Sequence, residues 1–178
     1  MLLEVCVDSL ASARAAIAGG ADRLELCSAL LAGGLTPYTE LLRQIRHESD
    51  VAVRCLMRPR AGDFLYMPEE IEMMCAQITE LRSAGANGFV IGCLNPDGTL
   101  DEARTKELVA LAGTKTKVFH RAIDVAPDWK KMLGRLIELG VDRVLTSGQA
   151  PDVFYGIDTI CEMIEFAQGA IQILRRGH

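Results

Sequence analysis

Gly20-Ala21-Asp22-Arg23-Leu24-Glu25-Leu26-Cys27 is the stretch that decides the fold, because a glycine that ends a helix is followed at once by a short strand. In that strand, leucines alternate with a carboxylate and a thiol, and Leu3-Glu4-Val5-Cys6-Val7 repeats the alternation. A strand of an open, doubly wound sheet is apolar on both faces. A barrel strand can turn polar groups inward, toward the mouth where barrel sites are built. The two stretches therefore favour a barrel.

Short apolar runs alternate with amphipathic stretches along the chain. The expected strands are Leu2–Val7, Arg23–Cys27, Ala52–Met57, Gly88–Gly92, Lys117–His120, Arg143–Thr146 and Ala170–Leu174. The expected helices are Ser9–Ala18, Tyr38–Glu48, Glu69–Ala84, Asp101–Leu111, Asp128–Leu139 and Ile157–Ala167. Strict alternation of strands and helices predicts a parallel sheet with right-handed crossovers. The predicted fold class is thus α/β, a TIM-type (β/α)8 barrel that is incomplete, with about seven strands and six helices.

The spacing of apolar residues supports the helices. Two stripes follow the i, i+3, i+4 pattern of one helix face, namely Ile71, Met74, Cys75, Ile78, Leu81 and Ile157, Ile160, Cys161, Ile164, Ala167. We expect both stripes, with Cys75 and Cys161, to pack in the core. Pro37 and Pro68 suit first helical positions, and Asp101 and Asp128 suit helix starts.

The number of elements falls short of a complete barrel, which has eight strands and eight helices in typically about 250 residues. The sequence therefore predicts one partial barrel domain over residues 1–178 that lacks the last helix–strand–helix portion. A truncated or frameshifted gene would give such a chain. We expect its first and seventh strands to have unpaired edges, which favour poor solubility or pairing with a second copy.

The composition excludes several classes of function. The chain carries a net charge of −5 and only 5% aromatic residues, whereas nucleic-acid binding needs a basic surface and stacking faces. With 49% hydrophobic residues it is not a disordered chain. No apolar run approaches the roughly 20 residues that span a bilayer, and no secretory signal is expected. Six cysteines without such a signal predict reduced thiols and a cytoplasmic protein.

Cys6 and Cys27 share a parity on neighbouring strands, so their sulfurs could lie within bridging distance. Two thiolates with little other coordination suit a soft ion such as Cu(I). The alternative is that both pack as small hydrophobic side chains. Cys55 and Cys93 allow either interpretation.

The other candidate residues lie at strand ends or on the expected inward face. His120, beside Arg121, could be an acid–base group or a metal ligand, or could bond Asp124 or a carbonyl for structural reasons. Glu4 and Glu25 would be costly to bury unpaired, and we expect them to pair with Arg58 or Arg60.

Several blocks, in order along the chain, resemble the copper homeostasis protein CutC family. They are Glu4–Ser9, Gly19–Cys27, Gly33–Pro37, Arg58–Arg60 with Gly62–Phe64, Phe119–Ala122 with Asp124, and Leu145–Gly148. The resemblance implies a cytoplasmic TIM-type barrel that binds copper as Cu(I), with Cys6 and Cys27 as the metal positions, and it implies a homodimer. Fold follows from such a resemblance more firmly than activity does.

Two function hypotheses follow, and the first is favoured. In the first, the chain is not an enzyme but a copper homeostasis protein with Cu(I) as its partner. In the second, it is a barrel enzyme of the lyase or isomerase type that acts on a small anionic metabolite. Arg58 and Arg60 would then clamp the anion, His120 would shuttle a proton, and Glu4, Glu25 or Asp124 would assist.

Overall fold

The computed structural model describes residues 2–175, which form two compact units. The first unit contains the residues up to Asp63 with Met67–Val90 and Leu111–Thr116. The second contains Phe64–Tyr66, Ile91–Ala110 and the residues from Lys117 onward. Each unit is described by itself below.

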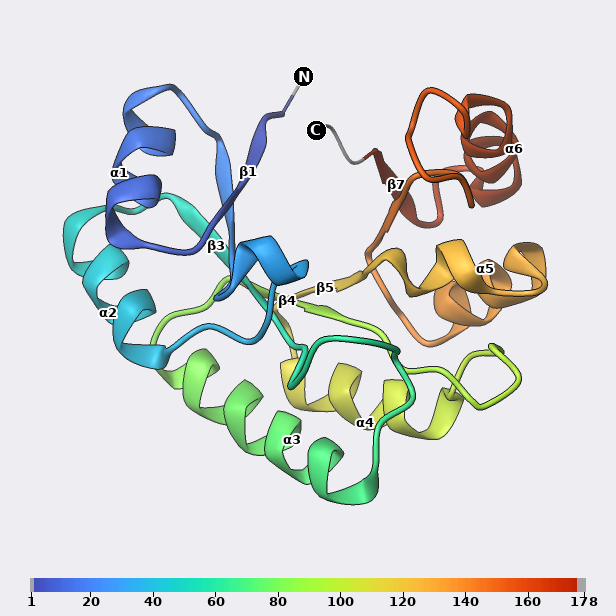
Figure 1. Ribbon diagram of the computed structural model, residues 1–178, viewed down its shortest axis with the longest axis horizontal. Helices are drawn as coiled ribbons and strands as arrows, with labels where there is room; N and C mark the ends of the chain where they lie inside the picture. Colours follow the sequence, from blue (N-terminus) through green and yellow to red (C-terminus); the bar gives the residue numbers. More distant parts are fainter. Residues whose placement is uncertain (1, 176–178) are drawn as a thin grey trace. The chain divides into compact units, whose positions relative to one another are not determined.

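The first unit is a parallel sheet with helices on one side (Figure 1). Its strands are β1 (Glu4–Val7), β2 (Arg23–Leu26), β3 (Ala52–Leu56) and β4 (Gly88–Ile91). Its helices are α1 (Leu10–Ala18), the 3-10 turn η1 (Leu30–Ala32), α2 (Thr39–Glu48) and α3 (Pro68–Ser83). Neighbouring strands in the sheet are consecutive in the chain, as in a barrel.

The second unit repeats this plan. Its elements are α4 (Glu102–Ala112), β5 (Thr116–Phe119), the 3-10 turn η2 (Arg121–Val125), α5 (Trp129–Glu138), β6 (Arg143–Thr146), α6 (Ile157–Ala167) and β7 (Gln172–Arg175). The strands are again parallel and consecutive. Apolar residues of β5, α5, β6 and α6 contribute to its core, including Phe119, Leu133, Val144 and Met163.

The predicted fold class is confirmed, since residues 2–175 contain seven strands and six α-helices in strict alternation. Observed element boundaries lie within two residues of the predicted ones. Polar N-cap residues explain part of the difference between the predicted and the observed helix starts. Ser9 and Asp128 lie just outside their helices as N-caps, and their side chains accept hydrogen bonds from the backbone N–H groups of Ser12 and Lys131.

Pro68 is the first residue of α3, as predicted. The prediction for Pro37 was wrong, because Tyr38 is the N-cap of α2 and the helix starts at Thr39. A glycine in the left-handed conformation follows the ends of three helices, at Gly20, Gly85 and Gly140, whose φ angles are +86°, +100° and +74°.

The apolar stripes predicted for α3 and α6 differ in how far they are buried. In α3, the isoleucines, Met74 and Leu81 are buried, and Cys75 is half-buried. In α6, only Ile160, Met163 and Ala167 are buried, whereas Cys161 and Ile164 are exposed. The prediction of a single buried face on α6 was therefore wrong. Spacing alone identifies an apolar helix but not how many of its faces are covered.

The helices of the described residues are too short or too polar to cross a lipid bilayer.

We predict that Thr105→Val will stabilise the protein. Thr105 of α4 is fully buried, and its hydroxyl has no hydrogen-bond partner among residues 2–175. Valine has nearly the same shape without the polar group, so the free energy of unfolding should rise by about 1 kcal/mol. Urea unfolding of both proteins measures the difference, and a loss of stability in the variant would contradict the prediction.

Candidate functional site

A buried ion pair organises the polar face of the first three strands. The register pairs Glu4 with Arg23 and Glu25 with Arg54. One oxygen of the Glu4 carboxylate, Oε2, lies 2.5 Å from Arg23 and 2.9 Å from Arg54. Arg54 is only 2% exposed and Arg23 8%. These three side chains therefore lie on one face, and the residues that alternate with them, such as Leu24 and Val53, are fully buried on the other.

The predicted partners of Glu4 were therefore wrong. Its guanidinium partners come from β2 and from the middle of β3, whereas Arg58 and Arg60 lie beyond the end of β3. Sequence reasoning did not single out Arg54, although an arginine between two apolar residues of a strand is a signal of a buried ion pair.

Cys6 and Cys27 lie on the same face as this ion pair. The register places Cys6 opposite Glu25, and the Cys6 thiol lies 3.5 Å from Oε1 of that carboxylate. Cys27 comes two residues after Glu25 and is buried, whereas Cys6 is exposed. The Cys27 thiol donates to the carbonyl oxygen of Val7, 3.6 Å away, so its sulfur leans toward β1. The two cysteines are thus diagonal neighbours on adjacent strands.

The loop after β2 covers Cys27. Gly34 has a φ of +85°, and a Cβ there would lie 3.5 Å from the Cys27 sulfur and 2.8 Å from Leu56. Only a glycine fits this close approach without strain. Gly33 and Gly34, from the sequence block Gly33–Pro37, thus allow the loop to cover the Cys27 thiol.

The described residues contain no group of three or more histidine, cysteine, aspartate or glutamate side chains that could hold a metal ion. A four-coordinate zinc centre needs such a group. Two thiols on neighbouring strands fit an ion of low coordination number, which is the preference of Cu(I).

Cys55 and Cys93 are buried. Burial raises the pKa of the Cys55 thiol to about 12. Because a thiol must lose its proton to bind a metal or attack an electrophile, Cys55 serves as a packing residue.

The side chain of Arg58 links two loops through hydrogen bonds. Its guanidinium donates to the carbonyl oxygens of Ala32, Gly34 and Gly62 at 2.8–3.3 Å. Its backbone N–H donates to the Thr36 hydroxyl, 3.0 Å away. These carbonyls take up part of the hydrogen-bonding capacity of the guanidinium, which has five N–H donors. This geometry indicates that Arg58 holds in place the loop that covers Cys27.

Arg60 is engaged by carboxylates of the protein. It lies 2.7 Å from Glu70 and 2.9 Å from Asp63. The hydrogen bond to Asp63, helped by Glu70, raises the pKa of the Arg60 guanidinium. Glu70 also accepts from the backbone N–H of Met67, so the contact anchors the start of α3.

His120 is packed at the end of β5 in the second unit. It is 5% exposed, its ring centre lies 4.6 Å from that of Phe64, and a Cβ on Gly92 would lie 2.2 Å from its Cε1. Nδ1 accepts a hydrogen bond from the backbone N–H of Ala122. The proton of the neutral ring is therefore on Nε2.

Asp124 organises the loop after β6. Its carboxylate accepts from Arg121 at 2.8 Å, from the Thr146 hydroxyl at 2.5 Å, and from the backbone N–H groups of Ser147 and Gln149. Arg121 adds a bond to the Ser147 hydroxyl. These contacts make Asp124 an anchor that joins η2 to the loop after β6, a role that its place near His120 in the sequence did not suggest.

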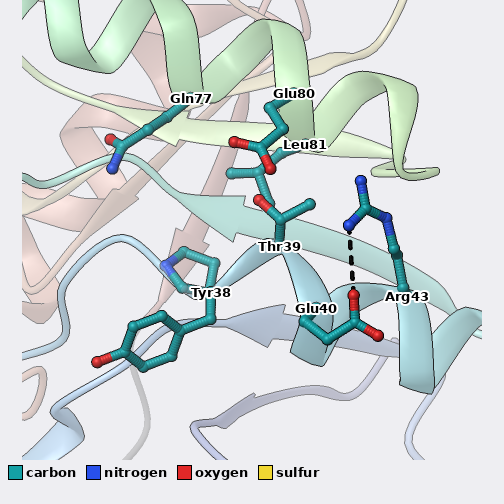
Figure 2. Close-up of a pocket in the computed structure, with 8 residues that line it drawn as sticks. Tyr38, Thr39, Glu40, Arg43, Gln77, Glu80 and Leu81 are labelled. Atoms are coloured by element: carbon teal, nitrogen blue, oxygen red, sulfur yellow. Dashed lines mark hydrogen bonds and ion pairs between the residues drawn. The ribbon is translucent and has the colours of Figure 1, made fainter.

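A surface hollow of about 390 Å³ lies between the start of α2 and the C-terminal half of α3, as Figure 2 shows. Its lining residues are Pro37, Tyr38, Thr39, Glu40, Arg43, Gln77, Glu80 and Leu81. Glu40 and Arg43 form an ion pair across its edge. No candidate residue lines it.

The family model described as "CutC family" matches residues 1–177. The chain belongs to the CutC family. Its relatives include a copper homeostasis protein cutC homolog of Caenorhabditis elegans, 44% identical over 173 residues that cover 97% of this chain and 69% of the relative. A CutC family protein of Treponema denticola is 43% identical over 175 residues, covering 98% and 71%.

Solved structures agree with this CutC assignment. The copper homeostasis protein CutC of Streptococcus agalactiae superposes with a TM-score of 0.92 at 28% identity, over 98% of this chain and 87% of that one. A 2,3-dimethylmalate lyase superposes with a TM-score of 0.69 at 15% identity, over 98% and 66%. The second likeness shows only the barrel fold, which many unrelated enzymes share.

We predict that Arg58→Ala will destabilise this CutC family member by about 2–3 kcal/mol, because hydrogen bonds from a charged donor to three carbonyls are lost. Arg58→Lys should recover only part of this, since an ammonium cannot span the three oxygens. Urea unfolding measures both. If phosphate or malonate raises the melting temperature of the wild type but not of Arg58→Ala, Arg58 is instead an anion ligand.

We also predict the order in which the thiols react with iodoacetamide at pH 8. Cys6 and Cys161 are exposed and should be modified first, whereas the raised pKa of Cys55 keeps it protonated and unreactive until the protein unfolds. Raising the pH to 9 should leave Cys55 unmodified, because that pH is still well below its pKa. Peptide mass spectrometry gives each rate, and early modification of Cys55 would contradict the assignment.

Proposed function

We propose that the chain binds Cu(I) through the thiolates of Cys6 and Cys27 and acts in copper homeostasis in the cytoplasm. The observation that carries this proposal is the placement of the two thiols on one face of adjacent strands, with the Cys27 sulfur leaning toward β1. The family assignment supports the connection with copper.

The accessibility of the two thiols differs in a way that suits capture of an ion. Cys6 is exposed and supplies the first contact with a Cu(I) ion delivered from solution. Cys27 is buried beneath the Gly34 loop and supplies the second thiolate in a place that water reaches poorly. Closing the site requires the Cys27 sulfur to turn from the Val7 carbonyl toward Cys6, a rotation about one side-chain bond.

Each thiol loses its proton when its sulfur binds the ion, so a filled site releases two protons. Both thiols already face oxygen acceptors, the Glu25 carboxylate for Cys6 and the Val7 carbonyl for Cys27. The buried Glu4–Arg23–Arg54 contact fixes the register of the strands and so holds the backbones of the two cysteines at constant spacing.

A reducing compartment is part of the proposal. The proposal requires the cysteines to be reduced, and none of the six forms a disulfide in the structure. Cu(I) and uncombined thiols persist together only where the redox poise is reducing, and the cytoplasm provides this.

We predict that the reduced protein binds about one Cu(I) per chain in competition with a chromogenic Cu(I) chelator. Cys6→Ser with Cys27→Ser should abolish this binding, because hydroxyl oxygens are poor ligands for a soft ion. Each single variant should weaken it.

Cys161→Ser is the matched control, since it removes an exposed thiol of α6 and should leave the stoichiometry and affinity unchanged. A thermal unfolding curve for each variant establishes that it is folded. A double variant that takes up copper like the wild type would refute the proposed site.

A second candidate function, a lyase or isomerase acting on a small anionic metabolite, is favoured by His120 alone. This imidazole is buried at the carboxyl end of a barrel strand, where barrel enzymes place their catalytic groups, and its tautomer is fixed. The arginines that would bind the anion are engaged by protein oxygens. Cu(I) binding is therefore the better supported function, and anion-dependent stabilisation that is lost in Arg58→Ala would reverse this ranking.

A further inference from the structure

The loop that covers Cys27 holds its own shape. It runs from Ala29 to Gly34 and includes the η1 turn, and we call it the η1 loop. The carbonyl oxygen of Ala29 accepts hydrogen bonds from the backbone N–H groups of Ala32, 2.8 Å away, and of Gly34, 3.2 Å away. Leu31 at the tip is fully exposed. The η1 loop therefore adds little to the apolar core and can move as one piece.

One antiparallel bridge closes the base of the η1 loop. In this bridge Ser28 and Leu35 each donate a backbone N–H to the carbonyl oxygen of the other, over N–O distances of 2.9 and 2.8 Å. Beside the bridge, Ala29 and Gly34 have φ angles of +48° and +85°, in the left-handed region. An alanine is uncommon there and stores strain. The points at which the chain turns thus lie at the two ends of the loop, where a few residues can absorb a hinge motion.

Arg58 lies outside the η1 loop and holds it against the end of the sheet. Its Nη1 atom lies 3.3 Å from the carbonyl oxygen of Ala32 and 3.1 Å from that of Gly34. On the other side, the Asp8 carboxylate accepts a longer hydrogen bond, 3.4 Å, from the backbone N–H of Leu30. Hydrogen bonds from a charged donor are the stronger kind. The closed position of the loop therefore depends chiefly on Arg58.

We propose that the η1 loop is a lid that controls access to the Cys27 thiol, and that Arg58 sets how often the lid opens. With the lid closed, Cys27 is only 1% exposed and Gly34 lies against its side chain. With the lid swung away, the thiol is open to solvent and to a Cu(I) ion. The role of the lid in copper uptake rests on the proposed function, whereas its control of access to the thiol does not.

Alkylation by iodoacetamide at pH 8, followed by peptide mass spectrometry, measures the opening of the lid. The measurements use Cys6→Ser, so that modification of the neighbouring thiol does not obstruct Cys27. Cys27 should react more slowly than the exposed Cys161 and much faster than Cys55. Low concentrations of urea should leave the Cys27 rate nearly unchanged and raise that of Cys55, because opening a lid exposes little surface and unfolding exposes much.

Two variants should open the lid in different ways. Arg58→Ala removes the hydrogen bonds to the lid carbonyls and should raise the Cys27 alkylation rate at least about tenfold. Gly34→Ala places a Cβ 2.8 Å from the Leu56 side chain and 3.5 Å from the Cys27 sulfur, so it should raise the rate as well. In both variants the Cys27 rate should remain insensitive to urea, since the thiol still reacts through local opening.

Each variant has a matched control in the same unit. Gly20→Ala introduces an alanine at a nearly identical φ of +86°, but its Cβ would meet no heavy atom of the described residues within 4 Å, its chain neighbours apart. Arg14→Ala removes a guanidinium whose partner is Glu48 of α2. Both controls should leave the Cys27 rate at its wild-type value.

Copper uptake is measured separately in the chain with both cysteines, as transfer of Cu(I) from a chromogenic chelator. Arg58→Ala should speed uptake and release alike and leave the affinity nearly unchanged, because the lid is closed both before and after binding. A chain whose Cys27 alkylation follows the expectations above but which takes up no Cu(I) would refute the proposed copper site and still support the lid.

Two outcomes would overturn the proposal. The first is an equal dependence of the Cys27 and Cys55 rates on urea, since Cys27 would then become accessible only when the protein unfolds. The second is a Cys27 rate in Arg58→Ala and Gly34→Ala that equals the rate in their controls, since the η1 loop would then not limit access to the thiol.

Discussion

The carboxylate of Glu4 accepts hydrogen bonds from two nearly buried guanidinium groups, those of Arg23 and Arg54, and the arrangement of the first three strands depends on this shared acceptor. Removing the carboxylate would leave two cations uncompensated at low exposure, which costs several kcal/mol. A shift of one residue in register would also turn Glu4 to the opposite face, against the apolar residues that include Leu24 and Val53. The ion pair therefore fixes both the register and the face.

The position of both candidate copper ligands follows from that register. With Glu4 opposite Arg23, Cys6 must lie opposite Glu25, and Cys27 must lie two residues farther on the same face. Diagonal neighbours on adjacent strands are roughly 8 Å apart between Cα atoms, given strands about 4.8 Å apart and a rise of about 3.3 Å per residue. That separation exceeds the span of an unstrained disulfide. The two thiols are thus poorly placed to oxidise to each other, and in the proposed function they share an ion instead.

The order of elements could be predicted from the sequence because it depends on local rules. Apolar spacing, capping residues such as Ser9, and glycines at helix ends act over a few residues. The partners of charged side chains depend on contacts across many residues, and they were predicted less well. Arg58 and Arg60 have the composition of an anion clamp, but carbonyls of the loops and the Glu70 carboxylate occupy them. Nothing in the local sequence shows where those oxygens come to lie.

Helix α6 shows that the periodicity of apolar residues does not predict which of them are buried. Apolar residues spaced three and four positions apart share roughly half of the helix surface. Within that half, however, Ile160 is buried, whereas Ile164 on the next turn is half exposed. Trp129 of α5 packs against Phe166 and so covers part of one flank of α6, and the spacing of the apolar residues does not show which flank a neighbouring helix covers. The strands behave differently, because their two-residue period assigns each side chain to one of only two faces. That is why the polar face carrying Cys6 could be recognised from the sequence alone, and why the second apolar face of α6 required the packing of its neighbours.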